Sequence, residues 1–249
     1  IFWLPWRNRP SDLATVASGP FRWGLWFLLF KLMFLSGATK LLSGDPNWRD
    51  LVALSYHYQT QPLPNWISWY MHHLPSWCHT AGGIVTLLIE LLVPCWIFSG
   101  RSLRHIASLS TLSLMLLIQL TGNYGFFNLL TAALCLPLLD DHFLRFLLRR
   151  KNQLSSPAVR VKSTWQIFAD RLILIGLLGI SSLTLTEELV RTCRMSQQTP
   201  SARDNPVWIT NGLNFCETNL LAPLRTPLLT HIRSSRTING YGLFRVMTT

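Results

Sequence analysis

Long apolar stretches separated by shorter polar segments dominate the chain. Five such stretches occur, at about residues 21–42, 80–98, 103–121, 126–139 and 172–185. A helix needs roughly 20 apolar residues to cross the hydrocarbon core of a bilayer, with about 17 as the lower bound. The first and third stretches meet that length, and the last two meet it only with flanking residues. The pattern therefore predicts an all-α integral membrane helix bundle with about five transmembrane helices.

The composition agrees with a protein whose solvent is a bilayer. Hydrophobic residues make up 49% of the 249 residues and charged residues only 13%, whereas soluble domains carry about 25% charged residues. The net charge of +11 does not come from a basic patch within a known nucleic-acid-binding module, because the basic residues cluster between the apolar stretches. We therefore expect membrane lipids as partners and no nucleic acid.

The distribution of basic residues predicts the orientation of the helices. Basic residues are frequent before the first stretch, between the second and third, and between the fourth and fifth. Because basic loops stay on the cytosolic side, we expect a cytosolic linker at 140–170 and an outer loop at 43–79, both within a transmembrane domain at 1–189. Residues 190–249 are expected to begin an extracytosolic domain that is truncated here, and a strand at 241–247 suggests that this domain is β-rich.

Three ionisable residues within the apolar stretches are candidates for function, because a charge in a bilayer is costly unless it is paired or wetted. Lys31 and Glu90 lie at similar depth in the first two helices, which predicts a buried ion pair between them; a proton or substrate pathway is the alternative. Lys40 lies near the outer end of the first helix, one turn beyond Ser36. We expect it to extend to the membrane surface or, if it is partly desolvated, to act as a base.

The outer loop at 43–79 is unusually aromatic. Trp66, Trp69, Tyr70 and Trp77 follow one another closely, and tryptophan and tyrosine favour the interface between membrane and water. We therefore expect a helix or hairpin that lies flat on the outer surface. Such a layer covers the bundle and does not cross the membrane.

Three of the histidines in the same loop are candidates for chemistry. His57 stands between Tyr56 and Tyr58 and is expected either as a hydrogen-bonded structural residue or as an acid–base group. His72 and His73 are adjacent, so on a helix they point in different directions and make a poor metal site. The sequence contains no nucleophile elbow, phosphate-binding glycine loop or zinc motif. We expect neither a metal nor another cofactor.

The cysteines follow the predicted topology. Cys193 and Cys216 fall on the outer side, where an oxidising compartment permits a disulfide between them. Cys78 lies on the same side, so the pairing stays open. Cys95 and Cys135 lie within helices, where the simplest interpretation is that of small apolar residues.

Several motifs resemble the lipase maturation factor family and occur in the order in which that family has them. The motifs lie at residues 31–41, 48–51, 56–64, 72–75, 89–94, 120–130, 138–141 and 239–249. The outer-loop motif contains Trp48 and Arg49. The turn motif contains Asn123, Tyr124 and Phe127. The resemblance covers nearly the whole chain and is weakest at about 150–235.

This resemblance implies a multi-pass protein of the endoplasmic reticulum membrane in a eukaryote, or of the inner (plasma) membrane in a bacterium. Eukaryotic members of the family are implicated in the folding and assembly of dimeric secreted lipases. The expected function is therefore that of a membrane-bound maturation or folding factor, not of an enzyme. Its client is expected to be a secreted lipase or another exported protein.

A second, more distant resemblance implies an alternative function. Residues 36–41, followed by Trp48, are similar to a motif in the membrane domain of vitamin K-dependent carboxylases, in which a lysine at the corresponding place is proposed as the catalytic base. This similarity implies a membrane-embedded enzyme with Lys40 as base and His57 nearby. A transporter that uses Lys31 and Glu90 is a third alternative, although the sequence lacks the broken helices and repeated halves of such proteins.

Overall fold

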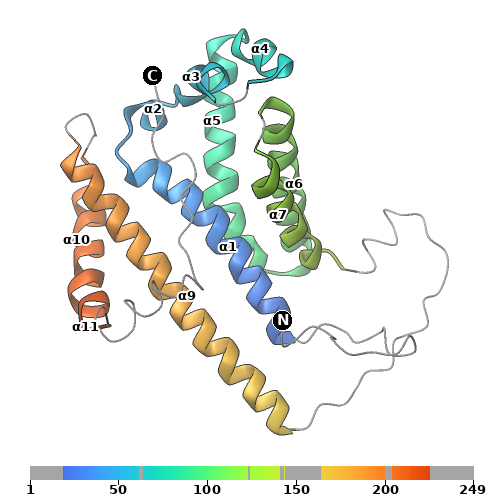
Figure 1. The fold of residues 1–249 in the computed structure, drawn as a ribbon, viewed down its shortest axis with the longest axis vertical. Helices are drawn as coiled ribbons and strands as arrows, with labels where there is room; N and C mark the ends of the chain where they lie inside the picture. The colour runs from blue at the N-terminus through green and yellow to red at the C-terminus, as the bar shows by residue number, and fades with distance from the viewer. Residues whose placement is uncertain are drawn as a thin grey trace, which may run out of the picture.

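A computed structural model describes the chain at residues 19–61, 64–122, 124–140, 143, 164–199 and 204–224. All regular elements in this part are helical, and no strand occurs among the described residues (Figure 1). The elements are α1 (Gly19–Leu42), α2 (Pro46–Arg49), α3 (Ala53–Thr60), α4 (Trp66–His72), α5 (Ser76–Leu91), the 3-10 helix η2 (Val93–Phe98), α6 (Arg101–Thr121), α7 (Gly125–Cys135), the 3-10 helix η3 (Leu136–Leu138), α9 (Thr164–Gln198), α10 (Val207–Cys216), the π-helical η4 (Glu217–Leu221) and α11 (Ala222–Leu224).

Four of these segments are long and apolar enough to cross a membrane, namely α1, α5 with η2 (Ser76–Phe98), α6 and α9. The fourth apolar stretch of the sequence forms the shorter helical segment Gly125–Leu138. The predicted all-α membrane bundle is therefore confirmed, and the protein is a multi-pass membrane protein. In its described part, four helices have spanning length instead of the five expected.

Two predicted features fall wholly or mostly outside the described residues. The strand expected at 241–247 lies there, and so does most of the linker expected at 140–170. Helix α9 already begins at Thr164, within the end of that linker. It also continues to Gln198, past the boundary expected at residue 189, so the helix connects the two expected domains without a break.

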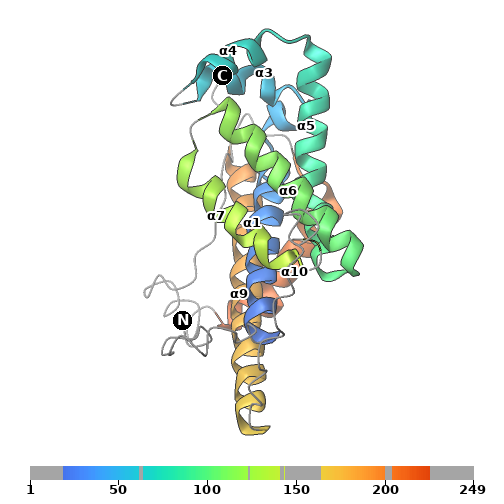
Figure 2. The ribbon, with the colours of Figure 1, turned by 90° about the vertical axis from the view of Figure 1, so that its right-hand side faces the viewer.

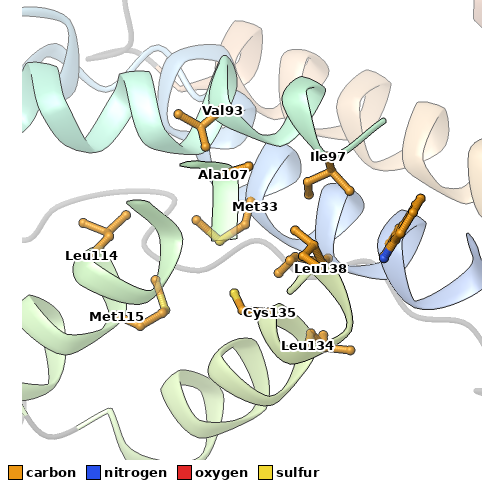
Figure 3. Packing of buried hydrophobic residues seen from close by; sticks show 11 residues of the cluster. Met33, Val93, Ile97, Ala107, Leu114, Met115, Leu134, Cys135 and Leu138 are labelled. Carbon is orange, nitrogen blue, oxygen red and sulfur yellow. The ribbon is translucent and has the colours of Figure 1, made fainter. Parts of the chain in front are cut away.

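Helix α1 occupies the centre of the bundle. It packs against α5, η2 and α7 on one side and against α9 on the other, and α9 runs beside it in both views (Figure 2). The hydrophobic core lies between α1, η2, α6 and α7 (Figure 3). Its buried members are Trp26, Leu29, Met33, Val93, Ile97, Ala107, Leu114, Met115, Leu134, Cys135 and Leu138. Only 6% of the apolar window of α9 is buried, which suits a helix that contacts lipid over most of that window.

Local sequence signals divide the outer loop into short helices. Pro46 occupies the first turn of α2, where its missing N–H costs nothing, and the Asp45 side chain caps that helix. Asn65 and Ser68 form a reciprocal capping box at the start of α4. At the other end of α5, Pro94 cannot donate to the helical ladder, and the chain continues as the 3-10 helix η2.

We call α2, α3 and α4 together the cap. The cap covers the end of the bundle at which α1 ends and α5 begins (Figure 1). The aromatic side chains of α4, with that of Trp77 in the first turn of α5, are largely exposed: 74% for Trp66, 59% for Trp69, 62% for Tyr70 and 70% for Trp77. The expected helical layer thus lies at one end of the bundle and presents aromatic rings outward.

Basic side chains gather at the opposite end of the bundle. The guanidinium carbons of Arg22 and Arg104 lie 5.4 and 4.6 Å from the ring centroid of Trp26. Arg101 forms an ion pair with Asp140, and the hydrogen bond from Arg101 lowers the pKa of the Asp140 carboxyl to about 2. Arg22 of the first basic cluster and Arg101 with Arg104 of the second, all expected in the cytosol, therefore lie at one end of the described structure.

Candidate functional site

An ion pair is buried between α1 and α5, directly beneath the cap. The ammonium nitrogen of Lys40 lies 2.6 Å from Glu90 Oε2 and 2.8 Å from Glu90 Oε1. Lys40 is 3% exposed and Glu90 is 4% exposed. Ser36 joins the pair, because its hydroxyl accepts from Lys40 at 2.8 Å and donates to Glu90 Oε1 at 3.1 Å. The ring of Trp48, on α2, lies over the ammonium, with 5.2 Å from Nζ to the ring centroid.

The close approach of α1 and α5 depends on Gly37. A Cβ at this position would lie 2.8 Å from Leu91 Cγ and 2.9 Å from Glu90 Cβ. Without a side chain, Gly37 lets the two helices come together, as small residues do between membrane helices. Ser36 and Lys40 are four residues apart on α1, so both side chains face the same neighbour.

The expectation that Lys40 extends to the membrane surface is wrong. The side chain turns inward to Glu90, and the cap closes over it through Trp48. A lysine extends to the membrane surface when water is the only polar partner available to its ammonium group. Here a carboxylate, a hydroxyl and an aromatic face satisfy the ammonium inside the protein.

The predicted ion pair between Lys31 and Glu90 is also wrong. The Lys31 ammonium donates to Thr184 Oγ1 on α9 at 2.7 Å. The first turns of α5 pack on the cap beyond the end of α1, as the 2.8 Å from a Cβ built on Gly82 to Leu54 Cδ1 indicates. Glu90 consequently reaches the level of Lys40, not that of Lys31.

His57 lies next to this site on α3. Its ring stacks on that of Tyr124, with 6.0 Å between centroids and 17° between planes, and 3.4 Å separates Tyr124 Oη from His57 Nε2. Tyr124 also donates to Gln61 Oε1 at 3.3 Å, and Gln61 donates to the Thr121 carbonyl at 2.8 Å. Burial, and to a smaller extent the charge of Lys40, lower the pKa of His57 to about 4. Burial raises the pKa of Tyr124 to about 12, so both rings are uncharged near neutral pH.

A cavity of about 60 Å³ adjoins the ion pair between α1, α5, α6 and α7. Its lining residues are Leu32, Met33, Ser36, Glu90, Met115, Ile118, Tyr124, Phe127, Asn128 and Thr131. The walls are mostly apolar, and Glu90 with Ser36 connects the cavity to the ion pair. A polar group at the end of an apolar pocket is the usual arrangement of a small-molecule site.

The other residues predicted in the outer loop have separate positions. Arg49 donates to the Asp204 carbonyl at 2.6 Å and to Asn205 Oδ1 at 2.6 Å, so it joins the cap to the segment between α9 and α10. Tyr56 is 37% exposed. His73 is hydrogen-bonded to the Trp69 carbonyl at 2.7 Å.

The remaining predicted residues do not form one site. His72 and His73 pack edge to face, and the described residues contain no group of three His, Cys, Asp or Glu that could hold a metal. Cys193 and Cys216 are both free thiols, so the possible disulfide between them is not formed. Cys193 instead accepts a hydrogen bond from Asn205 at 3.5 Å. Asn123 lies outside the described residues.

Sequence reasoning missed several polar residues of the site. Asn128 and Gln61 line or border it, and both are buried, at 7% and 6% exposure. Thr184 was missed as the partner of Lys31. For Asn128 a signal was available, because an amide within an otherwise apolar stretch requires a buried partner.

Comparison with known proteins identifies the family. Residues 1–146 match the family described as Lipase maturation factor transmembrane domain. Lipase maturation factor 2 of Homo sapiens is 50% identical over 123 residues, which are 49% of this chain and 17% of that protein. The corresponding protein of Xenopus laevis is 47% identical over 132 residues, 52% of this chain and 18% of that protein.

A third relative aligns with almost the whole chain. Lipase maturation factor 1 of Mus musculus is 29% identical over 253 residues, 97% of this chain and 38% of that protein. The chain spans about a fifth of the length of the two Lipase maturation factor 2 proteins described above. No solved structure matches it. Because the family match covers more than half of the chain, and because the described part forms an all-α membrane bundle, the chain belongs to the lipase maturation factor family.

Proposed function

We propose that this chain is the membrane-embedded part of a maturation factor that assists the folding and assembly of a secreted lipase or another exported protein. The family and the names of the relatives support the lipase client. Because the relatives described above come from human, frog and mouse, we assign it to the endoplasmic reticulum membrane. The cap then faces the lumen, where the client folds.

The observation that carries this proposal is the row of exposed aromatic side chains on the cap. Trp66, Trp69 and Trp77 are each more than half exposed, and tryptophan is enriched among residues that dominate protein interfaces. The cap is also anchored. The ring of Trp48 lies over the ammonium of Lys40 in the ion pair between α1 and α5, and Arg49 donates to the carbonyl of Asp204 between α9 and α10. A rigid aromatic surface suits transient contact with an unfinished client.

The test measures lipase secretion in cells that lack their own factor and are complemented with the full-length protein. In the cap variant, Trp66, Trp69 and Trp77 are replaced by Ala. In the control, Leu116 and Leu117 of α6, which are 59% and 56% exposed, are replaced by Ala. Secreted lipase activity is divided by the amount of factor in the membrane.

We expect the cap variant to lose at least tenfold in secretion, because truncation of one central interface tryptophan costs about 2 kcal/mol or more. The control should secrete normally. Normal secretion by the cap variant at a normal membrane level would contradict the proposal. Crosslinks from the client to residues at the opposite end of the bundle, and none to the cap, would contradict it as well.

A second candidate function is enzymatic, with Lys40 as the base. The observation in its favour is that Lys40 is buried next to a cavity and near His57. The contacts of Lys40 oppose it, because a base must be uncharged and a carboxylate at 2.6 Å stabilises the charged ammonium. Replacing both members of the ion pair separates the two functions, because a base is then lost and the cap is not.

A further inference from the structure

The cavity beside Glu90 contains hydrogen-bond acceptors that the protein leaves open. Glu90 Oε2 accepts one hydrogen bond, from Lys40, although a carboxylate oxygen has capacity for two. Asn128, which is 7% exposed, donates to Gln119 Oε1 at 3.1 Å. Its own Oδ1 accepts no hydrogen bond from the part of the chain that the structure describes. Asn128 lines the cavity, so this amide oxygen can accept a hydrogen bond from a group inside it.

The charges around the cavity restrict what that donor can be. Lys40 neutralises Glu90 and is held by it, so the cavity has no net charge to offer an ionic ligand. A phosphate would meet the Glu90 carboxylate without a free cation at the cavity wall. An uncharged hydroxyl group, by contrast, donates one hydrogen bond to an acceptor at no electrostatic cost.

The size of the cavity points to a small head attached to a longer chain. A volume of about 60 Å³ is several times the roughly 10–15 Å³ that one water needs. It therefore accepts a group of a few heavy atoms. Leu32, Met115 and Ile118 line the walls and provide an apolar path for a connected hydrocarbon segment.

The cavity lies toward the cap end of the bundle. Ser36, in its wall, lies six residues before the end of α1 at Leu42, which is roughly 9 Å along the helix axis. Since α1, α5 with η2 and α6 have the length and composition of membrane-spanning helices, membrane lipid is the source of hydroxyl groups next to these helices.

From these observations, we propose that the cavity between α1, α5, α6 and α7 binds the uncharged hydroxyl headgroup of a membrane lipid, with Glu90 and Asn128 as acceptors. The acyl chain extends along the apolar wall formed by α1 and α6. The site is independent of the client surface on the cap. A failure of the proposed lipase function would leave it standing.

The test uses full-length protein in phosphatidylcholine nanodiscs. The probe is a monoacylglycerol that carries a photoreactive diazirine in its acyl chain, and the reference probe is its derivative with both hydroxyls methylated. Asn128→Leu removes the acceptor and keeps the number and branching of the side-chain heavy atoms. The control is Leu129→Ala, which alters the neighbouring residue on α7 that is 71% exposed. Thr131→Val is a second cavity variant in case Asn128→Leu fails to fold.

We expect labelled peptides to contain Met115–Ile118 or Phe127–Thr131, and we expect about tenfold less labelling with the methylated probe. Asn128→Leu should reduce labelling to a similar degree, and Leu129→Ala should not. Equal labelling by both probes, or labels spread evenly over lipid-facing leucines, would overturn the proposal. Complete displacement by millimolar free glycerol would overturn the lipid assignment, because the ligand would then be a soluble polyol.

Discussion

Replacement of Lys40, alone and together with Glu90, separates the structural cost of the ion pair from any chemistry that it performs. Lys40→Met leaves the Glu90 carboxylate buried, with the Ser36 hydroxyl as its remaining donor in the described part of the chain. Breaking a buried pair in this way costs about 3–5 kcal/mol, because the charge that stays behind is uncompensated. Lys40→Met/Glu90→Leu removes both charges and leaves an apolar contact between α1 and α5.

The geometry sets the magnitude of both effects. At 2.6 Å and an effective dielectric constant of about 20, the attraction between the two charges is roughly 6 kcal/mol. The contact of the ammonium with the Trp48 ring adds about 0.5–2 kcal/mol. Desolvation of two ions opposes these gains by several kcal/mol per ion, so that the net contribution of a buried pair is often close to zero. We therefore expect the unfolding free energy of the double variant to lie within about 1 kcal/mol of that of the unmodified protein.

The assay combines denaturant unfolding of the purified full-length protein in detergent with lipase secretion normalised to membrane level. The single variant should lose about 3–5 kcal/mol of unfolding free energy and the double variant should regain most of it. Equal stability of the single variant and the unmodified protein would refute the argument, and so would a double variant as unstable as the single one. A stable double variant that secretes no lipase would show instead that Lys40 or Glu90 takes part in the function.

Three further predictions follow from local geometry. The pKa of His57 lies below its ordinary value of 6.5, at about 4, so the contribution of His57 to stability is present above pH 6.5 and lost as the pH falls through 4. His57→Gln should flatten the dependence of the unfolding free energy on pH in that window. An unchanged pH profile would contradict this expectation. Gly37→Ala should lower the unfolding free energy of the protein by about 1–3 kcal/mol, because the added Cβ would lie 2.8 Å from a side chain of α5. The control Gly24→Ala, whose Cβ would have nothing within 4 Å, should be neutral or stabilising in thermal unfolding. Arg49→Lys should lose the paired contacts to the segment at Asn205 and accelerate proteolysis between α9 and α10, and an unchanged cleavage rate would exclude that role.

The sequence was sufficient to predict the class of fold, because apolar stretches of about 20 residues are typical of helices that cross a membrane. It was less informative about the segment Gly125–Leu138, which is shorter than a spanning helix. Pro137 lies near its end, and the chain there turns from α7 into a 3-10 helix. The helical cap was also predictable, since Pro46 and Asn65 are strong signals for the start of a helix.

The proximity of His57 to Tyr124 was beyond the reach of sequence patterns. The two residues belong to different motifs, and they meet because the turn between α6 and α7 lies under α3. Such a contact depends on how the cap is placed on the bundle. Periodicity reports which face of a helix is buried and does not report which neighbour buries it.

The two lysines of α1 show that the depth of a residue in the membrane does not determine which neighbouring helix it contacts. Lys31 and Lys40 are nine residues apart, which is about two and a half turns of helix, so they project from opposite faces of α1. Only one of them can face α5, and the other must face whatever lies on the far side. The glycine that permits close contact, Gly37, lies on the face of Lys40. Helical phase therefore favours Lys40 as the partner of Glu90, and it requires for Lys31 a polar group on another helix, which Thr184 of α9 provides.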